Sequence, residues 1–474
     1  MATKEITPEQ TQYLEEMFER ARKAAKAIEN YSQERVDRMC QAVAWAAGNP
    51  DTFERLCWMG VDESGSGDRA NRFGKRHKIL GVLRDALRQK SVGLVDYNPV
   101  KGIAKYAKPA GVLTSLIPMT NPELTPIVTA IYALKARDVV VFSPHPRTKK
   151  TTFEVTRIMR EALKAIGEPE DILQCVENPN MAMVDQVMKM CDLIMATGGP
   201  AMTKAAHSSG KPAYCSGAGN ATMIFDDTTD PEIAARNTRI SKTSDFGSGC
   251  SADGNLVIYG GLYDKVVKAL QDEGGYLANA EQKEMLRKAM WDDEGHRIVA
   301  TVAVAPQQLA RSAGFEIPED RKFIMVEGGQ IGKENKFSGE KLTTLLSLFR
   351  YEGGFENALA MMDEIYKVGG RGHSCGIYSH NDEHIEALAL RAPVTRIMVR
   401  QPQSKANAGS AENGMPMTSS MGCGVWGGNQ VSDNIDLKYY MQYTHVSKPI
   451  LKDQPGEDVL FGEFYDAGVT RPKA

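Results

Sequence analysis

Residues 111–147 read GVLTSLIPMTNPELTPIVTAIYALKARDVVVFSPHPR, and the pattern changes twice within this stretch. Apolar runs at residues 111–118 and 138–143 end at a proline or just before one, and their composition is typical of buried strands. Residues 122–135 between them have the length and composition of a connecting helix. A strand, a helix and a second strand in this order are the unit of a parallel sheet. The stretch therefore predicts an α/β fold with a doubly wound sheet.

The same alternation extends beyond this stretch in two series. The first series continues with strands expected at residues 172–176, 193–197 and 212–215, and with helices expected at 148–166, 181–190 and 200–209. A boundary is expected near residues 226–231. The second series then has strands expected at residues 255–259, 323–326, 345–349, 374–378 and 396–399. Ligands bind where the strands of such sheets end, so we expect the loops at 118–122, 143–147 and 197–200 to face one crevice.

Three units follow from this pattern. We expect a Rossmann-type nucleotide-cofactor domain over residues 1–230, an α/β catalytic domain over 231–430, and a return segment with a C-terminal tail over 431–474. The first hundred residues are charged and amphipathic, which predicts a mostly helical cover rather than a site. Residues 96–109 are expected to form an extended excursion before the first sheet begins.

Charge and composition exclude several classes of function. The 57 Lys and Arg residues nearly balance the 60 Asp and Glu residues, so nucleic acid is not an expected partner. No apolar run is long enough to cross a bilayer, and the N-terminus lacks the pattern of a signal peptide, so no membrane contact is expected. The eight cysteines are scattered without a Cys-x-x-Cys pair, which fits neither a disulfide framework nor a zinc ribbon. We therefore expect a cytoplasmic protein.

Two loops of the first series could contact a nucleotide. Thr197, Gly198 and Gly199 follow a strand and precede a helix, so their backbone N–H groups could approach a phosphate, although a plain tight turn has the same pattern. Ser143, Pro144, His145 and Arg147 follow another strand and could contact a ribose or a 2′-phosphate. A proline-punctuated turn with solvated basic residues is the alternative interpretation.

Cys250 is the best candidate nucleophile among the eight cysteines. It follows Gly247 and Gly249 in DFGSGCS and stands just before an expected strand, so a substrate has room to reach its sulfur. The alternative is an inert buried cysteine. The His-x-x-Glu-His pattern at residues 380–384 spans a polar strand-to-helix turn, so no metal site is expected there.

Six short motifs together resemble those of CoA-acylating aldehyde dehydrogenases. They are PMTNP at 118–122, ATGGP at 196–200, GAGN at 217–220, the loop ending at Cys250, Gly372-His373, and GCGVWGGN at 422–429. The resemblance extends over residues 10–450 and is strongest to the aldehyde dehydrogenase half of bifunctional aldehyde-alcohol dehydrogenases, of which this chain looks like a stand-alone form. It implies an aldehyde dehydrogenase-like fold and the oxidation of an aldehyde to an acyl-CoA.

The resemblance also implies roles for individual residues. Cys250 corresponds to the nucleophile that forms a thiohemiacetal and then an acyl-thioester, and Asn121 corresponds to the side-chain donor that stabilises the oxyanion. Glu340 corresponds to the acidic contact of the nicotinamide ribose. The remaining cofactor contacts that the resemblance implies are Pro118, Thr120, Ser143, Pro144, His145, Arg147, Thr197, Gly198, Gly199 and Gly217.

Two departures from the general aldehyde dehydrogenase pattern matter for the reaction. The glutamate with which hydrolytic relatives activate water is replaced by Cys215 or Ser216, which favours transfer of the acyl group to coenzyme A over hydrolysis. In the adenosine pocket Ser143 and Pro146 replace residues that read the ribose hydroxyls. NAD and NADP therefore both remain open as cofactors, and coenzyme A is expected to use the same crevice as a co-substrate.

The substrate is expected to be a short aldehyde of two or three carbons. Thr125 near Asn121 and Ser251 beside the nucleophile give the tunnel a small and polar lining. Arg239, on an expected helix over residues 231–242, could hold an anionic substrate such as sulfoacetaldehyde, since sulfoacetaldehyde dehydrogenases belong to this branch. An exposed helix face or a contact with a CoA phosphate is the alternative for Arg239.

Two other functions remain open at this point. A hydrolytic aldehyde dehydrogenase would need another base, such as Glu352 or Glu356. A non-catalytic assembly subunit is disfavoured because both Cys250 and Asn121 are present. The resemblance implies a homodimer or homotetramer, with contacts through residues 96–109 and the C-terminal region.

Overall fold

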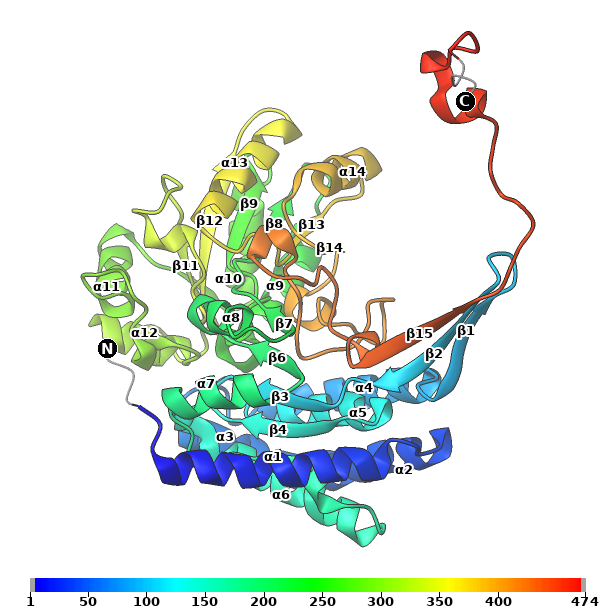
Figure 1. Cartoon of the computed structure of the whole chain (residues 1–474). Helices are drawn as coiled ribbons and strands as arrows, with labels where there is room; N and C mark the ends of the chain where they lie inside the picture. Colours follow the sequence, from blue (N-terminus) through cyan, green and yellow to red (C-terminus); the bar gives the residue numbers. More distant parts are fainter. Residues whose placement is uncertain (1–4, 470–474) are drawn as a thin grey trace.

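A computed structural model describes residues 5–469 of the chain, which begins with a block of four helices (Figure 1). These helices are α1 (Pro8–Ile28), α2 (Gln33–Gly48), α3 (Pro50–Ser64) and α4 (Arg76–Arg88), with the short 3-10 helix η1 (Arg72–Lys75) before α4. Thr7 caps α1 with a capping box, as the Thr7-Pro8 start signal predicts. The expectation of a helical N-terminal region is confirmed. The region is more than a cover, however, because Lys75 from it bonds to Asn121.

The first sheet has five parallel strands in the order β5-β4-β3-β6-β7. Its strands are β3 (Val112–Leu116), β4 (Val139–Ser143), β5 (Leu173–Cys175), β6 (Leu193–Thr197) and β7 (Ala213–Ser216). The connecting helices are α5 (Leu124–Ala136), α6 (Lys149–Ala165), α7 (Met181–Met190) and α8 (Pro200–His207), with η2 (Pro146–Thr148) before α6. All five strands and all four helices expected in this series are confirmed within a few residues at each end.

The strand order reverses between β3 and β6, and this is where the first crevice opens. Because β4, β3 and β6 are parallel neighbours, the loops that follow them lie side by side at the carboxyl edge of the sheet. Helix α5 is buried along its whole length, since the sheet covers one side and α2 and α4 cover the other. Its first turn therefore holds Asn121 and the loop before it against a rigid support.

The second sheet has seven parallel strands in the order β10-β11-β12-β9-β8-β13-β14. They are β8 (Thr222–Phe225), β9 (Asn255–Tyr259), β10 (Gly275–Leu277), β11 (Phe323–Glu327), β12 (Leu345–Tyr351), β13 (Cys375–Tyr378) and β14 (Ile397–Val399). Its helices are α9 (Pro231–Thr243), α10 (Tyr263–Asp272), α11 (Ala280–Met290), α12 (Pro306–Ala313), α13 (Phe355–Val368), α14 (Asp382–Arg391) and α15 (Gln403–Ala406).

The five strands expected in the second series are present, and the structure adds β8 and β10. Strand β8 pairs with β9 and β13, so the chain passes from the first sheet to the second within residues 217–221. The change of sheet thus comes a few residues before the boundary expected at 226–231. The reason is that β8 is only four residues long and follows β7 closely, so its apolar run reads as part of the first series.

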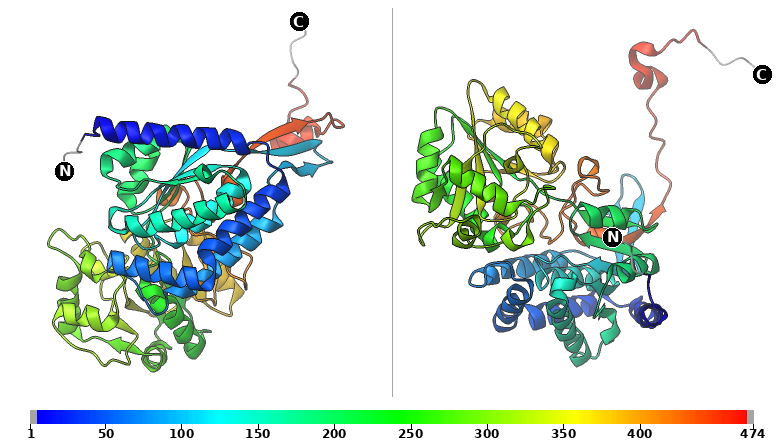
Figure 2. Two further views of the ribbon diagram at one scale, coloured as in Figure 1. Left: turned by 90° about the horizontal axis from the view of Figure 1, so that it is seen from below. Right: turned by 90° about the vertical axis from the view of Figure 1, so that its left-hand side faces the viewer.

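A third, antiparallel sheet extends from the body of the molecule (Figure 2). It contains β1 (Gly93–Asn98), β2 (Ile103–Pro109) and β15 (Met441–Ser447) in the order β1-β2-β15. The expected extended excursion at residues 96–109 is therefore a hairpin to which the return segment adds a strand. The tail beyond β15, with the short helix α16 (Glu457–Phe461), continues away from the two large sheets (Figure 1).

None of the helices in the described part of the chain combines the length and the apolar character needed to cross a membrane. Expectations that concern the first residues and the end of the tail fall partly on residues 1–4 and 470–474, which lie outside the described residues.

Candidate active site

Cys250 lies in a tight turn that leads into β9 and stands at the amino end of the second sheet. It is the only cysteine that is not buried among the eight, all of which are described and free of disulfides. A Cβ atom on Gly219 would overlap the carbonyl oxygen of Cys250, so only glycine allows this approach of the two loops. Accessibility thus singles out the cysteine that the glycine-rich approach predicts.

His373 is the side chain in contact with the Cys250 sulfur. Its Nε2 lies 3.0 Å from Sγ, and its Nδ1 lies 2.8 Å from Oγ of Ser374. Gln403 Nε2 and Asn407 Nδ2 both donate to that hydroxyl, at 3.1 and 2.6 Å, which leaves the Ser374 proton to be donated to Nδ1. The hydrogen-bond pattern therefore places the ring proton on Nε2, from which it is donated to the sulfur.

The electrostatic surroundings keep both partners of this contact uncharged. Burial lowers the pKa of His373 to about 3, and the nearby Arg396 guanidinium lowers it further in the same direction. Burial also raises the pKa of the Cys250 thiol to about 12, with Glu340 adding to the rise and Lys78 and Arg396 opposing it. His373 is thus a neutral donor to sulfur and not an imidazolium paired with a resting thiolate.

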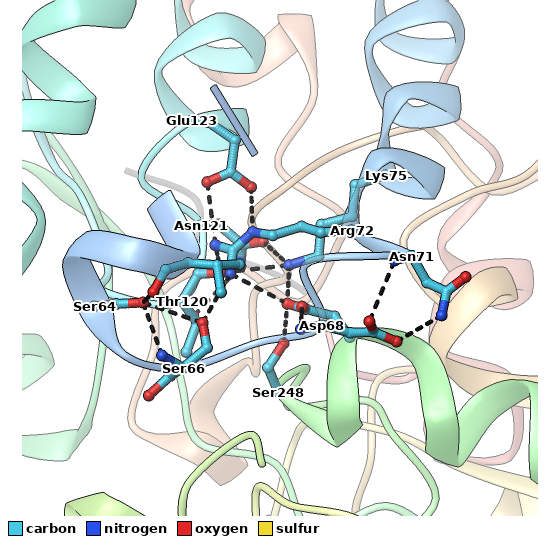
Figure 3. A network of polar contacts seen from close by, with 12 residues as sticks. Ser64, Ser66, Asp68, Asn71, Arg72, Lys75, Thr120, Asn121, Glu123 and Ser248 are labelled. Atoms are coloured by element: carbon cyan, nitrogen blue, oxygen red, sulfur yellow. Dashed lines mark hydrogen bonds and ion pairs between the residues drawn. The ribbon is translucent and has the colours of Figure 1, made fainter. Parts of the chain in front are cut away.

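Asn121 is held by a charged network that reaches across to the nucleophile loop (Figure 3). Lys75 Nζ donates to Asn121 Oδ1 at 2.7 Å and to Asp245 Oδ2 at 2.5 Å. Asp245 Oδ2 also accepts from Ser248 Oγ at 2.6 Å, two residues before Cys250. Because Oδ1 is occupied by Lys75, the amide nitrogen of Asn121 is the group left to donate, as an oxyanion donor must.

A second layer of buried charge supports this network. Arg72 Nε donates to Glu123 Oε1 at 2.7 Å, and Arg72 Nη2 donates to the Thr120 carbonyl oxygen at 2.7 Å. Burial disfavours the charge on Asp245, but Lys75 and Arg72 outweigh it and hold the pKa of that carboxyl below its ordinary value. Asp245 and Phe246 have φ angles of 48° and 51°, so the network also retains a strained turn.

The sequence interpretation missed Lys75 and Arg72, because they lie in the region assigned to a helical cover. Asp68, Arg72 and Lys75 are spaced by four and three residues, so they share one face of the chain around η1. This run of alternating charges on one face, beside the glycines at 65 and 67, is the signal that could have indicated a site.

Glu340 lies close to the nucleophile, in the loop before β12. Its Oε1 accepts the Gly219 N–H at 3.0 Å, and its charge acts on the Cys250 thiol. Burial raises the pKa of Glu340 to about 7, although the Gly219 N–H and the ammonium groups of Lys242 and Lys341 oppose the rise. Glu340 is thus a half-buried carboxyl group beside Cys250, where a ligand hydroxyl could reach it.

The candidate cofactor residues lie where three parallel strands of the first sheet end. Pro118 and Thr120 follow β3, the group from Ser143 to Arg147 follows β4, and Thr197 to Gly199 follow β6. A buried hydroxyl without a hydrogen-bond partner, Ser143 Oγ, stands at the end of β4. Orphaned polar atoms of this kind fit a ligand that completes their bonding, so the crevice has the chemistry of a nucleotide site.

Other members of this group are already engaged. Thr197 Oγ1 lies 2.8 Å from Ser420 Oγ, and Arg147 Nη2 donates to the Ser64 carbonyl oxygen at 2.6 Å, although its side chain is exposed. A Cβ atom on Gly199 would meet open space, and no side chain caps the first turn of α8. The backbone N–H groups at the start of α8 are therefore available to a phosphate.

Gly217 packs against a second cysteine on the other side of the crevice. A Cβ atom on Gly217 would lie 3.0 Å from Cys423 Sγ. Strand β7 ends just before it with Cys215 and Ser216, both buried, and Ser216 Oγ has no partner within residues 5–469. The strand end from which hydrolytic relatives would present a glutamate thus presents a thiol and a hydroxyl.

The two glutamates considered as alternative bases lie at the far edge of the second sheet. Tyr351 pairs with Tyr259 at the carboxyl end of β9, and Glu352 follows it directly. Cys250 precedes the opposite end of β9, so roughly 13 Å of strand separates the two edges. Glu352 pairs with Arg350 and Glu356 with Arg391. Neither glutamate is placed to activate water at Cys250.

The candidate substrate residues divide into two groups. Thr125 lies one helical turn after Asn121, and its Oγ1 is buried without a partner. Ser251 is buried beside Cys250. Arg239, however, forms an ion pair with Glu273, which caps α10, and the two side chains are 27% and 29% exposed. The structure therefore places Thr125 one turn after Asn121 and Ser251 next to Cys250, but it directs Arg239 toward the neighbouring helix.

The His-x-x-Glu-His pattern has a structural role of its own. Helix α14 begins at Asp382, so His380 precedes the helix and does not share a face with His384. His384 Nδ1 lies 2.7 Å from Asp226 Oδ2, and its ring stacks on Phe355. Asp226, Asp227 and His384 form a compact group, in which the His384–Asp226 contact accounts for the proximity.

Comparisons with known proteins agree with this geometry. Residues 3–281 match the family model described as "Aldehyde dehydrogenase family". The chain is 36% identical over 455 residues to an acylating sulfoacetaldehyde dehydrogenase of Bilophila wadsworthia, with 95% of this chain and 98% of the relative covered.

Two solved structures are similar throughout. An acetylating aldehyde dehydrogenase from Geobacillus thermoglucosidasius has a TM-score of 0.90 and 33% identity, covering 95% of this chain and 99% of its own. A propionaldehyde dehydrogenase of Rhodopseudomonas palustris, with bound CoA and an acylated cysteine, has a TM-score of 0.80 and 25% identity, covering 92% and 97%. The motif resemblance found in the sequence is thereby confirmed.

Proposed function

The chain belongs to the aldehyde dehydrogenase family, and on this premise we propose that it oxidises a short aldehyde to an acyl-CoA with Cys250 as the nucleophile. The observation that carries the proposal is the contact of the single accessible cysteine with His373, at the point where the loops of both sheets meet. The acylating relatives support coenzyme A as the acceptor.

The first half of the reaction forms an acyl-enzyme. The Cys250 thiol loses its proton to solvent, the thiolate adds to the carbonyl carbon of the aldehyde, and the electron pair of the C=O bond moves to oxygen. The amide nitrogen of Asn121 and the backbone N–H of Cys250 would donate to that oxyanion. The nicotinamide cofactor supplies the acceptor for the hydride that leaves the same carbon. The carbonyl then re-forms as a thioester on Cys250.

In the second half, the thiolate of coenzyme A adds to this thioester, and the same donors hold the second oxyanion. The Cys250 thiolate then leaves, and the Nε2–H of His373, 3.0 Å from Sγ, stabilises it. No carboxylate stands at the end of β7, and Glu352 and Glu356 lie at the other edge of the sheet, so none of these three positions supplies water with the base that thiolysis does not need. These features favour acyl transfer over release of a free acid.

The nucleotide would bind in the crevice of the first sheet. The N–H groups at the start of α8 fit its phosphates, and Ser143 and Glu340 fit its ribose groups. Arg147 is exposed, so it could bind the 2′-phosphate of NADP or remain solvated when NAD is bound. We propose NAD or NADP as the cofactor and the same crevice for coenzyme A.

The finer substrate assignment is a short aldehyde that carries an anion. The acylating sulfoacetaldehyde dehydrogenase of B. wadsworthia is a relative over nearly the whole chain, and this supports sulfoacetaldehyde as the substrate. The small side chains of Thr125 and Ser251 beside the reacting groups agree with a compact substrate.

We propose a homo-oligomer assembled through the antiparallel sheet and the tail. The tail presents large apolar side chains to solvent, which a second copy of the chain would cover. These side chains are Leu451, Val459, Leu460, Phe461 and Phe464. The unpaired cysteines agree with a reducing compartment, so we propose the cytoplasm as the location.

The test is the initial rate of NADH and NADPH formation with sulfoacetaldehyde, acetaldehyde and propionaldehyde, each with and without CoA. We expect strong dependence on CoA and an acyl-CoA product. Turnover without CoA that yields a free acid would contradict the proposal and would require a hydrolytic base.

A further inference from the structure

Two lysines near the nucleophile and its loop, Lys78 beside Cys250 and Lys405 beside Asp245, have no counter-ion of their own among residues 5–469. Lys78 belongs to α4 and Lys405 belongs to α15, so they reach this place from opposite ends of the sequence. Both are half-buried, and neither side chain forms a hydrogen bond or an ion pair with any residue from 5 to 469. Unpaired ammonium groups at partly buried positions are unusual, because desolvation disfavours their charge.

The position of Lys78 follows from that of Lys75. The two residues are three positions apart at the start of α4, so their side chains leave the same face of the chain. Lys75 reaches Asn121 and Asp245, and Lys78 is near enough to Cys250 for their charges to interact. Lys78 therefore lies on the wall that also carries the oxyanion donor.

Lys405 lies on α15 and is near enough to Lys75 and Lys78 for their charges to interact. The helix α15 packs behind His373. Gln403 and Asn407, which flank Lys405, both donate to Ser374 Oγ, and this hydroxyl contacts Nδ1 of His373. Ser404 also bonds to Ser241 of α9 at 3.0 Å. Asp245 is the carboxylate whose charge acts on Lys405. It already accepts hydrogen bonds from Lys75, Ser248 and the Asp68 N–H.

The three ammonium groups act on one another. Burial, followed by the charges of Lys75 and Lys405, lowers the pKa of Lys78 to about 8. Burial and Lys75 likewise lower the pKa of Lys405 below its ordinary value. A ligand that brings a negative charge between Lys78 and Lys405 would remove this mutual repulsion, which makes the pocket selective for an anion.

We propose that Lys78 and Lys405 bind the anionic head group, a sulfonate or a carboxylate, of an aldehyde whose carbonyl reaches Cys250. This inference rests on the proposed function and deepens it, because it names the residues that select the substrate. It also gives the role first considered for Arg239 to two other residues. Arg239 is paired with Glu273 and is not needed for it.

The first experiment compares substrates of different charge in Lys78→Met and Lys405→Met. We expect kcat/KM for sulfoacetaldehyde to fall roughly 10- to 100-fold in each variant, as for loss of a hydrogen bond to a charged group. Propionaldehyde, which has no charge, should lose much less than sulfoacetaldehyde, because only the effect of the lost lysine charge on the Cys250 thiol remains, and the KM for CoA should not change. Succinate semialdehyde, which carries a carboxylate, separates the two head groups. The exposed Lys268, paired with Asp272 on α10, supplies the matched control Lys268→Gln.

The second experiment does not depend on turnover. Iodoacetate and iodoacetamide both alkylate a cysteine with loss of iodide, but only the first carries a charge. We expect the ratio of their rates at Cys250, measured by peptide mass spectrometry, to favour iodoacetate in the wild-type protein relative to the Lys78→Met and Lys405→Met variants. The double variant should show the lowest ratio.

The outcomes separate the two proposals. Equal losses with charged and uncharged aldehydes, together with an unchanged alkylation ratio, would overturn the anion pocket and leave the proposed function intact. A rise in the KM for CoA alone would assign the lysines to a CoA phosphate and would also overturn it. A wild-type protein without CoA-dependent turnover of any aldehyde would contradict the proposed function, whereas a charge-dependent alkylation ratio would still support the anion pocket.

Discussion

The two walls of the site hold their reacting groups in different ways. On the wall of the first sheet, Asn121 is held by charges that are paired with one another, from Lys75 and Asp245 to Arg72 and Glu123. On the wall of the second sheet, Cys250 contacts a neutral His373, and no carboxylate bonds to either of them. The group that must stay in place is thus held by charge, and the group that must change its charge during reaction is held by neutral donors.

The largest effect is expected from removing the reacting atom itself. Cys250→Ala should abolish formation of the reduced cofactor, because no thioester can form, while nucleotide affinity remains nearly unchanged. Stopped-flow absorbance and calorimetric titration with NAD and NADP measure the two properties. Appreciable turnover in this variant would show that the neutral wall does not carry the nucleophile.

Removing the donor on the charged wall should have the next largest effect. Asn121→Ala should raise the barrier for kcat by about 2.7 to 4 kcal/mol, since the oxyanion loses a preorganised donor. Steady-state kinetics with saturating aldehyde measure this change, and Asn121→Asp provides a variant of equal size without the donor. A loss confined to KM would contradict the assignment.

The neutral character of the second wall predicts an unusual pH dependence. With the pKa of Cys250 raised to about 12 and that of His373 lowered to about 3, the free enzyme holds a thiol at neutral pH. The rate of Cys250 alkylation by iodoacetamide should therefore rise about tenfold for each pH unit between pH 7 and 9. A rate that is already constant above pH 7 would indicate an imidazolium-thiolate pair instead. His373→Ala should leave the slope unchanged.

Loosening the charged wall should have a smaller effect. Lys75→Met should lower kcat roughly tenfold for charged and uncharged aldehydes alike, because Asn121 loses the partner that orients its amide. Lys75→Arg should restore part of the activity, since it keeps a donor and a charge. A variant that loses only stability, as measured by thermal unfolding, with full kcat would show that Lys75 does not position Asn121.

The smallest effect is expected at Arg239, which lies outside both walls. Arg239→Leu should change the free energy of unfolding by about 1 kcal/mol or less, because it removes one partly exposed ion pair with Glu273. The KM for sulfoacetaldehyde should stay within about twofold of the wild-type value. A selective rise in that KM would return the anion-binding role to Arg239.

The local pattern of apolar residues in the sequence predicted most of the strands and helices. The strands at 139–143 and 193–197 are runs of apolar residues bounded by proline or glycine, and such runs are recognisable without any partner. Strands β8 and β10 escaped this interpretation, because runs of four and three residues carry too little period to be separated from their surroundings. The position of the change of sheet followed from β8 and was misplaced with it.

The site divides in the same way. Its motifs pointed to Cys250, Asn121 and Glu340, because glycines and turn residues leave a trace in the local sequence. Lys75, Lys78 and Lys405 left no comparable trace, since a lysine on an amphipathic helix has the same appearance whether it faces solvent or a pocket. Arg239 was proposed for the anion from its place on an expected helix and from the family resemblance, and the packing of α9 against α10 directs it to Glu273.

The sequence by itself determined the α/β class and the family and indicated Cys250 as the candidate nucleophile, because each depends on residues that are neighbours along the chain. Only the tertiary structure decided that His373 lies 3.0 Å from the sulfur, that Lys75 joins the two walls, and that Lys78 lies near enough to Cys250 and to Lys405 for their charges to interact. Apart from the contact between Lys75 and Asn121, these contacts join residues more than a hundred positions apart, and their geometry depends on how two sheets and a helical block pack together.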